Sequence, residues 1–191
     1  MATVHVTGGK EINRNLELQK DAMKSKVLAG MINAARVVDR DANKYGDPTV
    51  PLDIGNLRAS FFITTILGIK KGLAPKFMIE KGGSKLTPQQ FAELEAHHTM
   101  SVNTASTEVH TAANLTLIMG YGANYAIWVH EMTDPSINWT DGGSGPKWFE
   151  KSLKVNRDTM LKLIGNSARI TQIKGFAATR TSAANTETEE V

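Results

Sequence analysis

The chain has 191 residues and no cysteine, and its 22 lysine and arginine residues against 19 aspartate and glutamate residues give a formal net charge of +3. Disulfide bonds, thiol catalysis and cysteine-ligated zinc are therefore excluded. A charge this small gives no argument for nucleic-acid binding from bulk electrostatics. Hydrophobic residues make up 41% of the chain, which is enough to build an apolar core.

The length predicts a single domain over residues 1–173, followed over residues 174–191 by a flexible tail that is small, polar and finally acidic. No apolar run approaches the roughly 18 residues of a membrane span. The amino terminus shows no positively charged start followed by an apolar block. We therefore expect a soluble intracellular product without a membrane partner.

Helical periodicity marks the first part of this domain. Between Glu11 and Tyr45, apolar residues recur at spacings of three and four, which predicts a long amphipathic helix. Gly46-Asp47-Pro48 is expected to end it, because proline disfavours helical geometry in the residue before it. In the following segment, Asp53 or Asn56 is expected to cap a short helical turn.

The middle of the chain is typical of a sheet. Phe61–Ile69 is rich in β-branched and aromatic residues, and Asn114–Met119 is a second strand candidate. Tyr125–Glu131 is a short apolar element that fits either a strand or a helix. Residues 134–146 predict a turn-rich loop, and Pro146 then opens a second long helix. Together these elements predict an α+β fold.

Residues 70–111, between the two strand candidates, differ in character and are interpreted as an insertion that forms an exposed arm or loop. Thr87-Pro-Gln-Gln90 supplies a cap, a first-turn proline and a capping-box glutamine, so a helix is expected to start there and to end near His98. Five cations could contact phosphate, but Phe77 is the only aromatic residue among them, which favours a solvated loop. These cations are Lys70, Lys71, Lys76, Lys81 and Lys85.

Catalytic and cofactor-binding motifs are all incomplete. His130-Glu131 begins like a metalloprotease helix but lacks the second histidine, and the adjacent His97 and His98 point about 100° apart on a helix. Gly120-Tyr-Gly122 lacks the third glycine of a dinucleotide fingerprint, and residues 141–145 lack the ending of a phosphate-binding loop. We therefore expect no enzyme, cofactor or metal. A hydrolase centred on His130 and Glu131 is the enzymatic alternative.

Three tryptophans, Trp128, Trp139 and Trp148, lie in and around the turn-rich loop. One interpretation is that all three pack in the core. The other is that Trp139, at the loop tip, anchors a protein interface, where tryptophan is enriched. The sequence leaves both interpretations open.

Two segments resemble one known family. Leu52-Asp-Ile-Gly-Asn-Leu-Arg-Ala-Ser60 resembles the Gly-Asn-Leu-Arg-x-Ser element of the small tail-component proteins of tailed bacteriophages. Gly122-Ala-Asn-Tyr-Ala-Ile-Trp-Val-His-Glu131, followed by a glycine-rich loop and Pro146–Leu153, is similar to that family's Tyr-Ala-x-x-Val block and closing helix. The order of elements matches over about residues 11–165. The chain departs from the family pattern at Glu131-Met-Thr133 and at Trp148-Phe149.

The resemblance implies a twisted antiparallel sheet packed by two long helices, with an extended insertion arm. It also implies a structural virion protein of the neck or tail, made in the host cytoplasm, that joins or completes the head–tail connection. Such a protein assembles with copies of itself into a ring around the DNA path, for which a hexamer is favoured and a dodecamer is possible. Other neck and tail proteins and the genomic DNA in the channel are the further partners.

The interface candidates are Arg58, the five insertion lysines and Trp139. Arg58 could pair with a carboxylate of a neighbouring subunit or of its own core, and the sequence leaves this choice open. The insertion and the loop over residues 134–146 are expected to contact other virion components, because binding function tends to sit on long excursions from a core. The alternative function is a nucleic-acid-binding accessory module that uses the Lys70–Lys85 stretch.

Overall fold

The computed structural model describes residues 9–52, 55–72, 87–134, 136–139 and 141–169. The expected α+β class is confirmed. Three strands, β1 (Phe61–Thr65), β2 (Gly68–Lys71) and β3 (Leu117–Tyr121), form an antiparallel sheet in the order β2-β1-β3. The α-helices in the described ranges are α1 (Gly9–Arg40), α2 (Asn56–Ala59), α3 (Pro88–Thr111), α4 (Ala126–Glu131) and α5 (Trp148–Ala168). Within those ranges, no helix is both long and apolar enough to cross a membrane.

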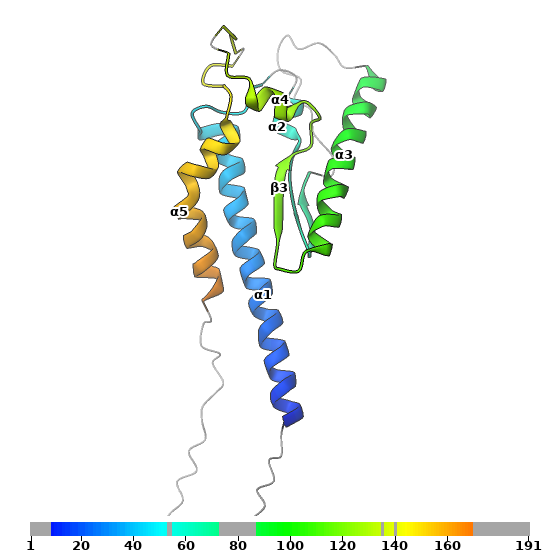
Figure 1. Ribbon diagram of the computed structural model, residues 1–191, viewed down its shortest axis with the longest axis vertical. Coiled ribbons are helices and arrows are strands. Elements are labelled where there is room, and N and C mark those ends of the chain that lie inside the picture. Colours follow the sequence, from blue (N-terminus) through cyan, green and yellow to red (C-terminus); the bar gives the residue numbers. More distant parts are fainter. Residues whose placement is uncertain (1–8, 53–54, 73–86, 135, 140, 170–191) are drawn as a thin grey trace, which may run out of the picture.

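The elements form three layers, with α1 and α5 on one face of the sheet and α3 on the other (Figure 1). Side chains alternate between the two faces of a strand, so Phe61 and Ile63 of β1 pack toward Ala35 of α1. Phe62 points the other way and packs against Val102 and Ala105 of α3. The central strand is therefore buried on both faces along its whole length.

The first strand is shorter than the sequence predicted. The chain turns at the exposed residues Ile66 and Leu67 and returns as β2, so the Phe61–Ile69 run is a hairpin rather than one strand. Gly68, with φ of +99°, supplies backbone geometry that favours glycine at this turn. Lys70 and Lys71 consequently belong to the sheet and not to an insertion loop. The two predicted strand regions pair with each other, because β1 is antiparallel to β3.

The prediction that the third helix ends near His98 is wrong. Its predicted start is confirmed, because the backbone N–H of Gln90 donates to Thr87 Oγ1 at 3.2 Å and the Gln90 side chain accepts from the Thr87 N–H at 2.9 Å. The helix then continues to Thr111, and His98, Val102, Ala105 and Val109 form its buried face. Residues 88–111 are therefore a layer of the fold and not an exposed arm or loop.

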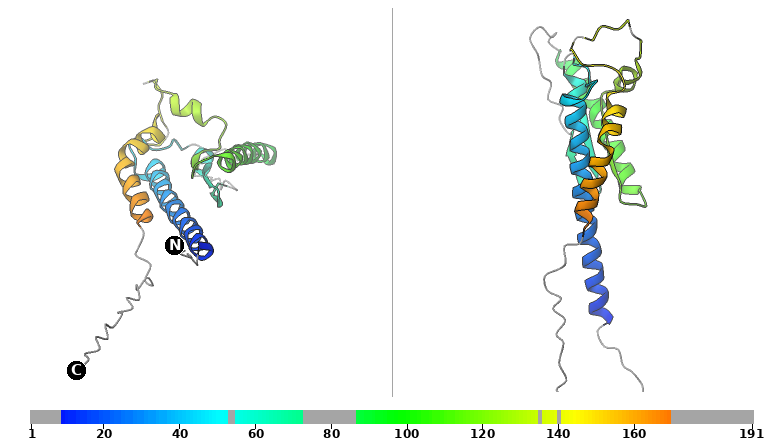
Figure 2. Two further views of the ribbon diagram at one scale, coloured as in Figure 1. Left: turned by 60° about the horizontal axis from the view of Figure 1, so that its bottom comes forward. Right: turned by 90° about the vertical axis from the view of Figure 1, so that its left-hand side faces the viewer.

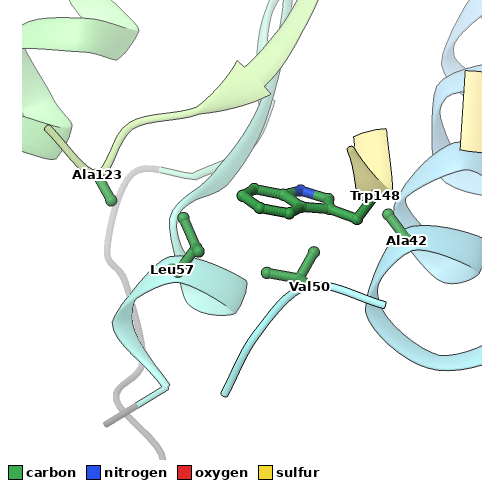
Figure 3. Packing of buried hydrophobic residues seen from close by; sticks show 5 residues of the cluster. All are labelled: Ala42, Val50, Leu57, Ala123 and Trp148. Atoms are coloured by element: carbon green, nitrogen blue, oxygen red, sulfur yellow. The ribbon is translucent and has the colours of Figure 1, made fainter. Parts of the chain in front are cut away.

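A cluster around Trp148 joins the ends of the layers (Figure 3). The indole is 1% exposed and packs with residues from four other segments, Ala42, Val50, Leu57 and Ala123. Lys147, just before α5, adopts a left-handed backbone with φ of +59°, and its N–H donates to the His130 carbonyl at 2.9 Å. Of the three tryptophans, Trp148 is thus the core residue.

The first half of α1 extends beyond the rest of the folded chain (Figures 1 and 2). The long helix predicted over residues 11–45 is confirmed, and Asp41–Tyr45 forms its final π-helical turn. Buried residues of α1 begin only at Leu28, and every residue from Gly9 to Lys26 is exposed. This half of the helix has no covering layer in the described part of the chain.

Replacing Trp148 with alanine should destabilise the protein by about 3–5 kcal/mol, because it leaves a large cavity where five segments meet. The matched control is Trp128→Ala, since Trp128 is 73% exposed and its loss should change stability by less than about 0.5 kcal/mol. Urea unfolding in dilute solution measures both values. Equal effects of the two substitutions would contradict the assignment of Trp148 to the core.

The pH dependence of stability should depend on His98. Burial lowers the pKa of this imidazole below its ordinary value, and its Nε2 contacts the Gly72 carbonyl. Below about pH 6.5 the unfolded chain takes up a proton that the folded chain excludes, so the free energy of unfolding should fall with decreasing pH. The slope from this one group is at most about 1.4 kcal/mol per pH unit.

Urea unfolding between pH 7.5 and pH 5 measures this slope. His98→Gln should flatten it, because glutamine does not titrate. His97→Gln, at the exposed neighbouring position, should keep the slope of the unmodified protein. The same slope in all three proteins would show that His98 is not responsible.

Candidate functional site

Residues 55–60 and 122–131, which carry the two motifs noted in the sequence, lie against each other. Asn56, in the first segment and 2% exposed, donates a hydrogen bond from Nδ2 to Tyr125 Oη at 3.0 Å. Leu57 shares the Trp148 cluster with Ala123. Asn56 does not cap the short helix, because Gly55 is the N-cap residue, with φ of +82°. Asp53, the other predicted cap, lies outside the described residues.

Arg58 is paired within its own chain. Its Nε donates to the Val50 carbonyl at 2.8 Å, and its Nη2 forms an ion pair with Asp141 of the turn-rich loop. Only 21% of the Arg58 side chain is exposed. The sequence left open whether Arg58 pairs with a carboxylate of a neighbouring subunit or of its own chain, and in the structure it pairs with one of its own chain. Arg58 thereby connects the turn-rich loop to the Val50 segment.

Arg58 and Lys71, two of the interface candidates, line the same groove of about 470 Å³. Lys71 Nζ pairs with Asp39 at 2.6 Å. The other two cations of the lining, Arg40 and Lys44, lie over the Tyr45 ring, 5.7 and 5.2 Å from its centroid, and have no ion pair among the described residues. With four cations and one carboxylate in its lining, the groove suits a carboxylate or phosphate group.

The remaining candidates have different surroundings. Lys70 is exposed on β2. Lys76, Lys81 and Lys85 lie outside the described residues, as does the predicted tail over residues 174–191. Trp139 is half-buried. Ser144, in the same loop, forms an isolated β-bridge with Thr49. The interface prediction for Trp139 stays untested.

Sequence reasoning missed an exposed apolar surface on α4, which we call the α4 patch. It consists of Ile127, Trp128 and Met132, with exposures of 67%, 73% and 41%. The open choice for Tyr125–Glu131 is resolved, because this element is a helix. A second such surface, the α1 stripe, consists of Ile12, Leu16 and Met23, which are 56%, 56% and 44% exposed. Periodicity identifies such faces but does not show which of them the fold leaves uncovered.

His130 and Glu131, at the end of α4, form a short polar network. His130 Nδ1 contacts Glu131 Oε1 at 2.8 Å, and the same carboxylate pairs with Lys147. The hydrogen bond from Lys147 contributes most, and with that from His130 it holds the pKa of the Glu131 carboxyl below its ordinary value. The ring of His130 packs edge-on against that of Trp148, with 4.8 Å between the ring centroids. Across the described residues, no group of three histidine or acidic side chains is placed to hold a metal.

Arg58→Met should cost about 1–3 kcal/mol of stability, because it leaves the Val50 carbonyl and the Asp141 carboxylate without their donor. Combining it with Asp141→Asn should give a loss smaller than the sum of the two single losses, since the side chains are in contact. Lys71→Met is the matched control and should cost at most about 1 kcal/mol, because the Lys71 side chain is more exposed than that of Arg58 and Asp39 keeps a hydrogen bond from Asn43. Strict additivity in urea unfolding would contradict the Arg58–Asp141 contact.

Comparison of the chain with protein-family models, curated proteins and solved structures finds no match in any of the three. The candidate sites are therefore defined by this chain's own residues. They are the cationic groove at the end of α1, the α4 patch and the α1 stripe.

Proposed function

We propose that this protein is a structural subunit of the neck or tail of a tailed bacteriophage, where it joins or completes the head–tail connection as part of a ring around the DNA path. The observation that carries this proposal is the uncovered first half of α1, which exposes Ile12, Leu16 and Met23. Most of the stability of a helix in a protein comes from packing of its apolar face. Packing against another subunit would cover these side chains and stabilise the helix.

The placement of the two apolar surfaces supports assembly into a ring. The α1 stripe and the α4 patch lie at opposite ends of the elongated fold (Figure 1). Contacts between two different surfaces of identical subunits are head-to-tail, and they generate a closed ring when the rotation between neighbours closes. A hexamer is the favoured size and a dodecamer the other, as the family resemblance implies.

The contact between the two family-like segments also supports the proposal. The Asn56–Tyr125 hydrogen bond and the shared Trp148 cluster bring together the Gly-Asn-Leu-Arg turn and the Tyr-Ala block. These are the segments on which the resemblance depends. Residues that matched the family separately in the sequence thus form one structural unit.

A direct test is the mass of the assembled protein and its presence in virions. We expect the purified chain to form a six-subunit species in native mass spectrometry, and a phage that encodes it to contain it in ring stoichiometry. Particles made without it should show unjoined heads and tails. Absence of the chain from purified, infectious particles would overturn the proposal.

The cationic groove favours a second candidate function, a nucleic-acid-binding module. Arg40 and Lys44 line it without an ion pair among the described residues. This function requires retention on DNA that falls steeply with salt and is weakened by Arg40→Ala and Lys44→Ala. A ring subunit needs little affinity for free DNA, so salt-insensitive and weak retention would favour the ring.

A further inference from the structure

We infer that the α1 stripe of one copy binds the α4 patch of the neighbouring copy. This inference rests on the proposed self-assembly and names the two surfaces that meet. The experiment below separates its failure from the failure of ring formation.

The stripe continues a surface that already packs within the chain. At 100° per residue, Ile12, Leu16 and Met23 lie within about 40° of one another around α1, on the side that also carries Gly30. Gly30 faces α5, because a Cβ at that position would meet Ser167 and Ile164. Helix α5 ends at Ala168, and beyond it the same side of α1 has no covering element among the described residues. A second packing partner there would extend the existing interface.

The charges around the stripe are basic. Lys20 and Lys26 lie about 60° to either side of its centre, whereas the acidic residues of this half-helix lie about 120° or more away. These acids are Glu11, Glu17 and Asp21. Lys20 also forms an exposed pair with Glu17 at 3.0 Å. Lys26 has no ion pair in the described part of the chain and is free to meet an acidic partner.

The charges around the α4 patch are acidic. Glu131 follows Ile127 by one helical turn, and Asp134 lies just beyond Met132. A hydrogen bond from the Ser136 backbone holds the pKa of Asp134 below its ordinary value, so this exposed carboxylate is anionic at neutral pH. Glu131 is engaged by Lys147, whereas Asp134 has no ion pair within the described ranges. Lys26 and Asp134 are therefore the complementary charges available to the two surfaces.

A second copy is the occupant that this arrangement favours. The two surfaces lie at opposite ends of one fold (Figure 1), so a chain cannot bring its own stripe and patch together. Identical copies supply both surfaces in equal number. Among the other exposed apolar residues, Leu18 lies about 140° from the centre of the stripe, the hairpin turn at Ile66 and Leu67 has no acidic neighbour in sequence, and Met100 is a single side chain.

The size of the contact matches a closed ring better than an isolated pair. A buried tryptophan contributes about 150–250 Å², and a stable interface needs about 1,200–2,000 Å² in total. Trp128 and the five smaller side chains alone supply less than that total, so one such contact by itself is weak. Ring closure gives every copy two such contacts, which raises the effective concentration of each.

The experiment uses full-length chains with one surface removed at a time. Leu16→Asp removes the stripe and Trp128→Ala removes the patch, and each variant alone should be monomeric or at least about tenfold weaker in assembly, as expected for a central anchor. Mixing the two variants at concentrations well above those at which the unmodified chain assembles should give a one-to-one dimer through a single contact, because each retains the surface that the other lacks. Met100→Ala, also exposed, should assemble like the unmodified chain.

A charge exchange gives an independent readout. Lys26→Glu and Asp134→Lys should each weaken assembly, and the chain that carries both substitutions should recover it. Lys10→Glu is the matched control, because Lys10 lies about 140° from the centre of the stripe and should leave assembly unchanged. Circular dichroism of every variant checks that the fold is intact.

The outcomes are distinguishable by native mass spectrometry. If the unmodified chain forms rings and Trp128→Ala still does, the pairing is overturned while the proposed ring stands. If the Leu16→Asp and Trp128→Ala variants fail to pair even at these high concentrations, the contact is not head-to-tail between these surfaces. If Leu16→Asp leaves the mass of the assembly unchanged, the pairing is overturned, and residues 170–191 or another protein are the alternative cover of the stripe. If the unmodified chain is monomeric, both proposals are overturned.

Discussion

The burial of Trp148 is the interaction on which the arrangement of this fold depends. One indole contacts the final turn of the first long helix through Ala42, the short α2 helix through Leu57, and the segment after β3 through Ala123. Tyr121 and His130 add edge-on ring contacts at 6.0 and 4.8 Å. Because Trp148 is also the first residue of α5, its position fixes where that helix starts and places it beside α1.

The unequal lengths of these two helices then account for the exposed surface. Helix α1 has 32 residues and its final π-helical turn adds 5, whereas α5 has 21, and with a rise of about 1.5 Å per residue the difference is about 24 Å. Since the Trp148 cluster fixes the start of α5 near the C-terminal end of α1, the excess length falls at the other end. There Ile12, Leu16 and Met23 are exposed, so a constraint in the core determines which surface of α1 is left without a packing layer in the described part of the chain.

Local signals in the sequence predicted local structure well. The periodicity over Glu11–Tyr45 predicted α1, and the Thr87–Gln90 pattern predicted the capping box, because both depend on neighbouring residues alone. The length of α3 was not predictable in this way, since its Ser-, Thr- and Asn-rich second half has weak helical propensity and is held by packing of Val102 and Ala105 against Phe62. Likewise, Trp128 and Trp148 differ in exposure only through tertiary contacts, which spacing does not encode.

The candidate sites show the same division between local chemistry and tertiary placement. Arg58 is an interface candidate by sequence, yet its guanidinium group binds the Val50 carbonyl and the Asp141 carboxylate within the chain. Arg40 and Lys44, which no motif singles out, line the same groove without an ion pair among the described residues. The groove lies near the C-terminal end of α1 and the stripe near its N-terminal end. Because α1 is one continuous helix, a partner bound at the stripe would fix the direction in which the groove faces.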